Sequence, residues 1–563
     1  MSTFGGLYVG GAGIKSSQNA LNTTAHNLVN VNTTGYTRQQ VYMAEMSPNT
    51  VGASAISMMQ AGLGASYDEA RQIRDVFLDK SYRTESGRQA FYDTQYSSVS
   101  ELEVYLGEME GVSFQNSLLE LYRAAEEWDK IPDDPNNLDL VILKSVELLE
   151  RAGSVYDGLK GYQQDINEKI SNQIDELNKI GKQISELNHE ILKIEAAGVE
   201  KANDLRDDRN LLIDQLSSYG YVEVNQMYDG LLEIKFEGEF FVVRSGCNEM
   251  AGYTDNLTGF VTPVWPELVV NNEPVMNHQV YDFTHAIDSE KNTDIGSLKS
   301  LILSRGMDYA DYTDMEGLSS EDYRTGLQTR TIMNAEAELD RMMHSLVTRM
   351  NDLLSPTVEL TDDSGRIFKV WDEANSAIGI GQEGPSEEMF VRKNLSRYRE
   401  MFLTVGGETQ KYYVYNEENM SDTDTLYSID SLEINPKLLE NENLLPHRRA
   451  NGEVDSGMTS KMVELFNEKL INLNPNDETK LSIMDFYQSM VNLFGNEGST
   501  YKSKAETLAV TVNAVSNKRQ QVVGVSSDEE LGNMIKFQNA YNASSRYINV
   551  VNEMIEHLLT NLG

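Results

Sequence analysis

Few side chains in this 563-residue sequence have the types and spacing that metal binding requires. The His of the segment NHEIL, residues 188–192, lacks the second His of the zinc motif H-E-x-x-H. His278 and His285 lie in a predicted loop, where structural or solvent-facing histidines are more common than metal ligands. The remaining histidines are scattered along the chain. The sequence therefore predicts no metal site.

The carboxylate pairs and glycine-rich segments give no better candidate for catalysis. Asp207-Asp208 and Glu417-Glu418 could provide an acid and a base, but sequence neighbours point apart, so we expect solvated side chains. The hexamer GIGQEG, residues 379–384, lacks the strand and helix of a phosphate-binding loop and predicts a turn. Neither a Walker A motif nor a G-x-S-x-G elbow is present. We predict that the chain is not an enzyme and has no catalytic residue and no cofactor.

Composition narrows the choice of partners. The chain has 47 Lys and Arg against 88 Asp and Glu, a formal net charge of -41. This charge argues against binding to nucleic acid or to an anionic lipid surface. Cys247 is the only cysteine, which excludes an intramolecular disulfide. No apolar run is long enough for membrane insertion, and the N-terminus lacks the basic region of a cleaved signal. We expect a cytoplasmic protein, or one exported without a cleaved signal.

The pattern along the chain indicates an α+β, multidomain fold with terminal helices and inserted β-rich domains. Residues 88–219 predict long helices, within which Ile170, Leu177, Ile184 and Ile191 predict a solvated coiled coil. Turns at Asp229-Gly230 and Glu237-Gly238 mark a β-rich region, and helical patterns return at 297–304, 329–354 and 457–523. The predicted domains are a terminal assembly domain (1–42 plus 524–563), a helical middle domain (43–219 plus 296–356 plus 434–523), a β-rich outer domain (220–295) and a β-rich insertion (357–433).

The N-terminal segment is almost free of charge. Lys15 is the only Lys, Arg, Asp or Glu before Arg38, where the average composition predicts about nine. One interpretation is a disordered polar tail. The other is a helix packed among copies of itself, where uncharged polar residues avoid repulsion between subunits. Its expected apolar stripe, spaced by seven residues, is Leu7, Ile14, Leu21 and Leu28.

The segment HNLVNVNTTGY, residues 26–36, predicts where this helix ends. Asn27, Asn30 and Asn32 are weak helix formers, and Gly35 can take the left-handed conformation. We therefore expect the helix to stop between Asn30 and Gly35.

The C-terminal segment carries a matching stripe. Ser527 and Glu530 fit a capping box before a long helix. Such a helix needs a partner, and the N-terminal helix has the same spacing. We predict that the two ends pair, are unfolded in the free chain and fold on assembly. The expected contact residues are Met534, Phe537, Tyr541, Ile548, Val551, Ile555 and Leu558.

These two ends resemble a known family. GIKSSQNALNTTAHNLVNVNTTGYTRQQV and SSDEELGNMIKFQNAYNASSRYINVVNEMI are similar to the flagellar rod, hook and hook-associated axial proteins. GYTRQ, with Gly35, Tyr36, Arg38 and Gln39, resembles the hook-associated protein 1 members. Thr34 departs from the Pro of many members. Interior segments at 113–162, 202–224 and 434–441 are also similar.

The resemblance implies a structural adaptor between the bacterial flagellar hook and the filament. Its implied partners are further copies in a ring, the hook protein, a second junction protein or flagellin, and an export chaperone on the C-terminal helix. It also implies an extracellular location reached by type III export. One alternative is an exported axial protein whose β-rich insertion serves as an adhesin or hydrolase. Another is a hook or filament subunit, against which GYTRQ and the long helical middle argue.

Overall fold

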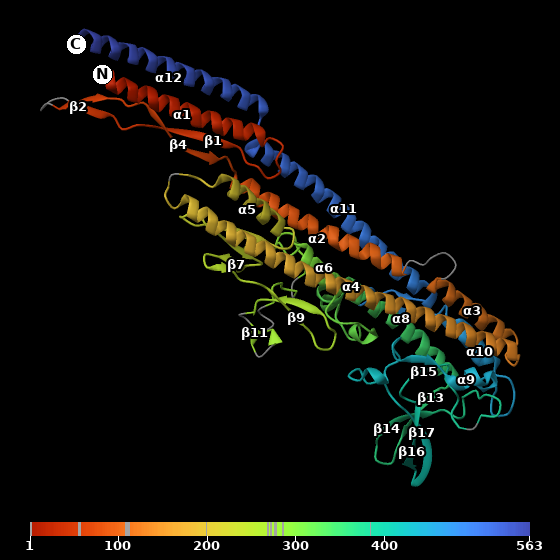
Figure 1. Ribbon diagram of the computed structural model, residues 1–563. Helices are drawn as coiled ribbons and strands as arrows, with labels where there is room; N and C mark the ends of the chain where they lie inside the picture. The colour runs from red at the N-terminus through yellow and green to blue at the C-terminus, as the bar shows by residue number, and fades with distance from the viewer. Residues whose placement is uncertain are drawn as a thin grey trace.

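The two ends of the chain lie side by side at one end of an elongated molecule (Figure 1). The computed structural model describes residues 3–53, 58–106, 113–198, 200–266, 269–270, 273–274, 279–283, 286–382 and 384–562. Long helices run the length of the molecule, and small antiparallel sheets project from one side of them (Figure 1). The predicted α+β, multidomain fold is confirmed. The boundaries proposed for the four domains stay a prediction.

Helices form most of the elongated body of the molecule, which we call the rod. Several of these helices begin at a side chain that caps free backbone N–H groups. Ser113, Asp134 and Ser482 each accept a hydrogen bond from the first turn that follows them. Pro135 starts the longest helix, where its missing N–H costs nothing. The helices are α1 (Thr3–Val29), α2 (Val76–Leu106), α3 (Phe114–Lys130), α4 (Pro135–Glu195), α5 (Asn203–Leu216), α6 (Ser297–Arg305), α7 (Ser320–Thr325), α8 (Thr331–Leu354), α9 (Pro436–Glu440), α10 (Ser456–Leu465), α11 (Ile483–Val523) and α12 (Ser527–Leu562).

The strands pair in short antiparallel sheets. Two sheets have four strands, in the orders β5-β6-β7-β8 and β13-β14-β17-β16, and the other sheets have two. The strands are β1 (Gln39–Glu45), β2 (Asn49–Ala53), β3 (Met58–Ala61), β4 (Ala65–Gln72), β5 (Val222–Gln226), β6 (Leu232–Phe236), β7 (Glu239–Val243), β8 (Gly246–Cys247), β9 (Ala251–Thr254), β10 (Val261–Val264), β11 (Val269–Val270), β12 (Glu273–Pro274), β13 (Thr357–Thr361), β14 (Ile367–Trp371), β15 (Phe390–Arg392), β16 (Tyr398–Val405), β17 (Glu408–Tyr415), β18 (Leu432–Ile434), β19 (Ile471–Asn472) and β20 (Lys480–Leu481).

The rod is held together by α2 and α11, which run alongside each other (Figure 1). A buried ion network ties this pair to α5. The guanidinium of Arg519 lies 2.9 Å from Asp79 of α2 and 2.7 Å from Asp214 of α5. Arg83 of α2 also contacts Asp214, at 2.7 Å. Because both carboxylates are largely buried and paired, removing one partner would leave an uncompensated charge.

The stripe of isoleucine and leucine on α4 does not form the coiled coil that its spacing predicts. Ile170, Leu177, Ile184 and Ile191 are buried, but α4 packs there against α5 and the β-rich region of β5–β10. Gly181 allows this close approach, since a Cβ there would lie 2.4 Å from the Phe241 ring. A heptad spacing defines the buried face of a helix but does not say whether a helix or a sheet covers it.

Two further segments differ from the sequence predictions. Residues 39–53 and 58–72, largely assigned to the helical middle domain, instead form a long antiparallel hairpin in which β1 pairs with β4 and packs on α1. The helical pattern predicted for 457–523 is interrupted between α10 and α11, where β19 pairs with β20. The predicted turn at Glu237-Gly238 is confirmed, since both residues have positive φ.

Candidate assembly site

Helices α1 and α12 meet through the small residues of α1. A Cβ added to Gly10 would lie 2.5 Å from the Ile548 side chain, and one added to Gly13 would lie 2.6 Å from the Ser544 hydroxyl. Gly6 lies in the same way against Val551. Glycine therefore allows the two backbones to approach each other closely. The buried residues of α1 are Gly6, Gly10, Ser16, Ser17, Ala20, Thr24 and Asn27.

Within the single chain, the close contact of α1 with α12 runs through small residues and not through the predicted stripe. The stripe of Leu7, Ile14, Leu21 and Leu28 is only half-buried. Small side chains were overlooked because sequence periodicity weighs large apolar residues, whereas a close helix crossing needs small ones. The role of this stripe in assembly stays a prediction.

The predicted residues of α12 are covered unequally. Val551 is buried against α1, whereas Tyr541 and Leu558 are exposed. Other large apolar side chains of α12, including Ile535 and Met554, are more than half exposed. Within the single chain, α12 thus keeps an extensive apolar surface. The half-buried members of the predicted set are Met534, Phe537, Ile548 and Ile555.

A buried hydrogen-bond network joins the end of α1, the following loop and the start of α12. We call it the clasp and define it as Asn27, Tyr36, Arg38, Gln39 and Glu530. Asn27 is fully buried and donates from Nδ2 to the Gln39 carbonyl (2.9 Å) and to Glu530 Oε2 (3.2 Å). Its Oδ1 accepts from the Gln39 N–H (3.0 Å) and from the Tyr36 hydroxyl (2.8 Å). All four hydrogen-bonding positions of this amide are satisfied.

The clasp also contains an ion pair across 492 residues of sequence. Arg38 donates from Nε to Oε1 of Glu530 at 2.8 Å, and its Nη1 lies 2.8 Å from Oε2 of Glu529. Glu530 is 2% exposed. The Arg38 N–H donates to the Val523 carbonyl at the end of α11 (2.8 Å). One arginine therefore contacts both C-terminal helices from the N-terminal loop.

The loop of the clasp is anchored to the rod by Asp207 of α5. The Thr37 N–H donates to Asp207 Oδ2 at 3.0 Å. Burial raises the pKa of Asp207 to about 6, although the hydrogen bonds from Thr37 lower it. Asp207 was expected to be solvated, and this is wrong, because the residue lies on the inner face of α5. Its neighbour Asp208 is exposed, because the side chains of adjacent residues point in different directions from a helix.

The remaining residues of the segment 26–36 lie at the end of α1 and in the turn that follows it. α1 ends at Val29, just before the predicted interval, and Asn30 donates from Nδ2 to the His26 carbonyl (3.1 Å). Gly35 has a φ of +83°, which confirms its left-handed conformation. Asn32 is exposed. The predicted capping box is shifted by one residue, since Ser526 rather than Ser527 accepts from the Glu529 N–H (3.4 Å), which leaves Glu530 for the clasp.

The other residues considered for catalysis or metal binding make no catalytic or metal-binding arrangement among the described residues. Glu418 accepts from Tyr312 (2.8 Å) and lies 3.0 Å from His344, so it is not solvated, whereas Glu417 is exposed. The segment GIGQEG contains the predicted turn, with Gly381 at positive φ. His278 and His285 lie outside the described residues. Among the described residues no cluster of His, Cys, Asp and Glu could hold a metal ion, and no helix is long and apolar enough for a membrane span.

Comparisons with known proteins agree with this architecture. The family "Flagellar hook-associated protein FlgK helical domain" matches residues 99–368, "Flagellar basal body rod FlgEFG protein C-terminal" matches 519–562, and "Flagella basal body rod protein" matches 7–37. The Flagellar hook-associated protein 1 of Bacillus subtilis (strain 168) is 25% identical over 586 aligned positions, covering 100% of this chain and 99% of that protein. That of Escherichia coli (strain K12) is 22% identical and covers 97% and 98%.

A solved structure shares the fold. The flagellar hook junction protein FlgK from Burkholderia pseudomallei superposes with a TM-score of 0.52 at 13% identity, covering 79% of this chain and 100% of that one. Terminal helices that pair beside a rod, with family matches at both ends and in the middle, define a flagellar axial protein. Within this class, the chain belongs to the hook-associated protein 1 family.

The pairing of α1 with α12 can be tested with an engineered disulfide. A Cβ at position 13 would lie 3.3 Å from the Ser544 Cβ, close to the spacing that a disulfide bridges. In a Cys247→Ser background, we expect Gly13→Cys with Ser544→Cys to oxidise nearly completely in assembled flagella. Migration on a non-reducing gel measures the bond.

The matched control pairs Ser544→Cys with Gly11→Cys, since Gly11 has no atom of another segment within 4 Å of its Cβ position. In the free chain, where we expect both ends to be unfolded, the two pairs should oxidise slowly and alike. Equal oxidation of both pairs in flagella would show that the helices do not pair as described.

Proposed function

We propose that this chain is the structural adaptor that joins the bacterial flagellar hook to the filament. It assembles as a ring through α1 and α12, with hook protein on one side and a second junction protein or flagellin on the other. The observation that carries the proposal is the pairing of the nearly uncharged α1 with α12, whose exposed surface keeps several large apolar side chains. A charge on α1 would recur on each copy around a ring, whereas the apolar side chains of α12 can be buried there.

The exposed residues of α12 support this role. Ile535 is 61% exposed, Met554 is 55% exposed and Leu559 is 68% exposed, all on one helix. Large apolar side chains gathered on one element mark a surface that another molecule covers. Further copies of the same helix pair would cover it in a tube.

The same surface explains why export would need a chaperone. An apolar helix exposed before assembly would aggregate, so we place an export chaperone on α12 until the chain leaves through the type III apparatus. The final location is then the extracellular hook–filament junction.

The relatives support a structural role. The Burkholderia pseudomallei protein is described as a hook junction protein, and the two bacterial relatives as hook-associated proteins. None of these proteins is named as an adhesin or a hydrolase.

Deletion of the gene tests the proposal. We expect intact hooks without filaments by electron microscopy, with flagellin shed into the medium, because filament subunits would have no lattice to join. A plasmid copy of the wild-type gene should restore filaments. Filaments of normal number in the deletion strain would contradict the adaptor role.

A further inference from the structure

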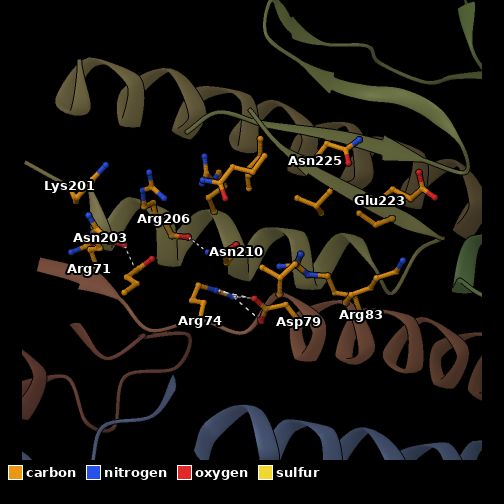
Figure 2. A pocket seen from close by; sticks show the side chains of 18 of the residues that line it. Arg71, Arg74, Asp79, Arg83, Lys201, Asn203, Arg206, Asn210, Glu223 and Asn225 are labelled. Atoms are coloured by element: carbon orange, nitrogen blue, oxygen red, sulfur yellow. Dashed lines mark hydrogen bonds and ion pairs between the residues drawn. The ribbon is translucent and has the colours of Figure 1, made fainter. Parts of the chain in front are cut away.

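A cleft with a positive lining lies between α2, α5 and the strand β5 (Figure 2). It has a volume of about 760 Å³. Seven of its lining side chains are Lys or Arg and three are Asp or Glu, in a chain where acidic residues outnumber basic ones by 88 to 47. The cleft thus reverses the charge balance of the molecule.

Some of these cations are neutralised within the chain. Arg74 forms two hydrogen bonds with Asp79, both 3.1 Å, as the dashed lines in Figure 2 show. Arg206 binds both carboxylate oxygens of Glu195, at 2.8 and 2.7 Å. These pairs fix the walls of the cleft, and their cations need no ligand to balance their charge.

The floor of the cleft is different, because buried guanidinium nitrogens there lack partners. Arg209 is 2% exposed and donates from Nη1 to the neutral acceptors Asn188 Oδ1 (2.7 Å) and Gly230 O (3.4 Å). Within the part of the chain that the structure describes, Arg209 Nε has no hydrogen-bond partner, and neither has Nη2 of Arg83, whose Nε is paired with Asp214. Burial lowers the pKa of Arg209 to about 9, which reflects how poorly its charge is solvated. A negative charge placed in the cleft would compensate it.

The rim adds cations that a ligand can reach. Lys80 is exposed and forms no ion pair among the described residues. Lys201 is 39% exposed at its side chain, and its nearest carboxylates are at 3.8 and 4.0 Å. The cleft is elongated, with Lys201 and Arg71 at one end and Glu223 and Asn225 at the other (Figure 2). This shape suits an extended chain better than a single small anion.

We propose that this cleft binds acidic side chains of a second copy of this chain in the assembled ring. The inference rests on the proposed function, because only assembly brings copies together. Charge complementarity selects this occupant: each copy has a net charge of -41, and its acidic residues would otherwise repel those of its neighbours. The position also suits assembly, since Arg74 of the cleft lies 3.8 Å from Asp207, which anchors the clasp.

The cleft can be tested on the free full-length chain with a fluorescein-labelled hexaglutamate peptide. By fluorescence anisotropy, we expect binding at about 50 mM NaCl that is lost at about 500 mM, because salt screens exposed charges. Lys80→Glu and Lys201→Glu should each weaken binding about tenfold. The matched control is Lys461→Glu on α10, an exposed residue at the other end of the rod (Figure 1). It makes the same charge change and should leave binding unchanged.

Absence of peptide binding, or an equal loss in Lys461→Glu, would overturn the cleft as a carboxylate site. This outcome is independent of whether the chain joins hook to filament, which the deletion strain tests.

A second experiment identifies the molecule that occupies the cleft. Carbodiimide joins a lysine amine to a carboxylate with loss of water, and in isolated flagella it should give a covalent dimer of this chain. The dimer should be lost when Lys80 and Lys201 are both changed to Gln. Attachment of these lysines to a different polypeptide would overturn the assignment to a second copy.

Discussion

Replacing Glu530 by alanine is expected to abolish filament attachment while the rod of the protein stays folded. The change removes the acceptor of Arg38 Nε and of Asn27 Nδ2 in a site that is almost inaccessible to water. Leaving a charged donor and an amide donor unpaired costs roughly 2–4 kcal/mol. Because the clasp is the buried polar contact between α12 and the N-terminal loop, we expect a loss of this size to detach α12. Electron microscopy of a deletion strain carrying the variant measures the result as hooks without filaments.

Glu529→Ala is the matched control. Glu529 also contacts Arg38, but its side chain is 62% exposed, so its loss should cost less than about 1 kcal/mol and leave filaments in place. Circular dichroism should show thermal unfolding of the rod unchanged in both variants, because among the described residues the two carboxylates that are removed bind Asn27 and Arg38 and no residue of α2, α4 or α11. Filaments at the wild-type number with Glu530→Ala would show that the clasp does not hold the assembly helices.

The sequence predicted the elements of the assembly site better than their contacts. The uncharged composition of α1 and the periodicity of both segments were enough to find α1 and α12, because each is a local property of one segment. The closest contacts could not be predicted, since the close crossing depends on Gly10 opposite Ile548, two residues far apart in the sequence. Glu530 was read as a helix cap, a local role, while its partners Asn27 and Arg38 lie at the other end of the chain.

Contacts elsewhere in the fold were also missed, because a local sequence pattern does not identify the partner of a segment. The buried face of α4 was found from its spacing, but nothing in that spacing says that β-strands cover it. The hairpin formed by residues 39–53 and 58–72 was missed, since β1 has no fully buried residue and the β-bulge between Tyr42 and Met43 interrupts its alternation of half-buried and exposed positions. The burial of Asp207 had no local signal, because the buried apolar residues Ile213 and Leu216 lie on another side of α5 and the loop containing Thr37 covers Asp207.

Helix α8 contains three buried carboxyl groups that the sequence pattern does not indicate. Glu336, Glu338 and Asp340 are each fully buried, and no ion pair is formed by any of them among the described residues. Glu336 accepts from the Ala310 N–H (3.0 Å), and Glu338 accepts from Asn334 Nδ2 (3.3 Å). Burial is the main reason that the pKa of Glu336 and that of Glu338 are each raised to about 8. Both groups are therefore protonated in the folded protein at neutral pH.

This arrangement predicts that the rod loses stability as the pH rises. A carboxyl group with a pKa near 4.3 in the unfolded chain and about 8 in the folded one binds its proton more tightly when folded. The stabilisation of the folded state by the bound proton is complete below about pH 4 and is lost progressively up to about pH 8, on the order of 5 kcal/mol for each group. We expect Glu336→Gln and Glu338→Gln to match the wild type near pH 5 and to be more stable than it near pH 9. Urea unfolding of the full chain at both pH values measures this difference.

Glutamine suits this test because it has nearly the shape of a protonated glutamic acid and keeps a carbonyl oxygen to accept the same hydrogen bond. It has no charge to bury, so the free energy of unfolding of the variant should lack the pH dependence contributed by that site. Glu506→Gln changes an exposed residue of α11 and should follow the wild type at every pH. If the α8 variants instead kept the full pH dependence of the wild type, Glu336 and Glu338 would have to be ionised within the folded rod. Their burial without a paired cation argues against that state.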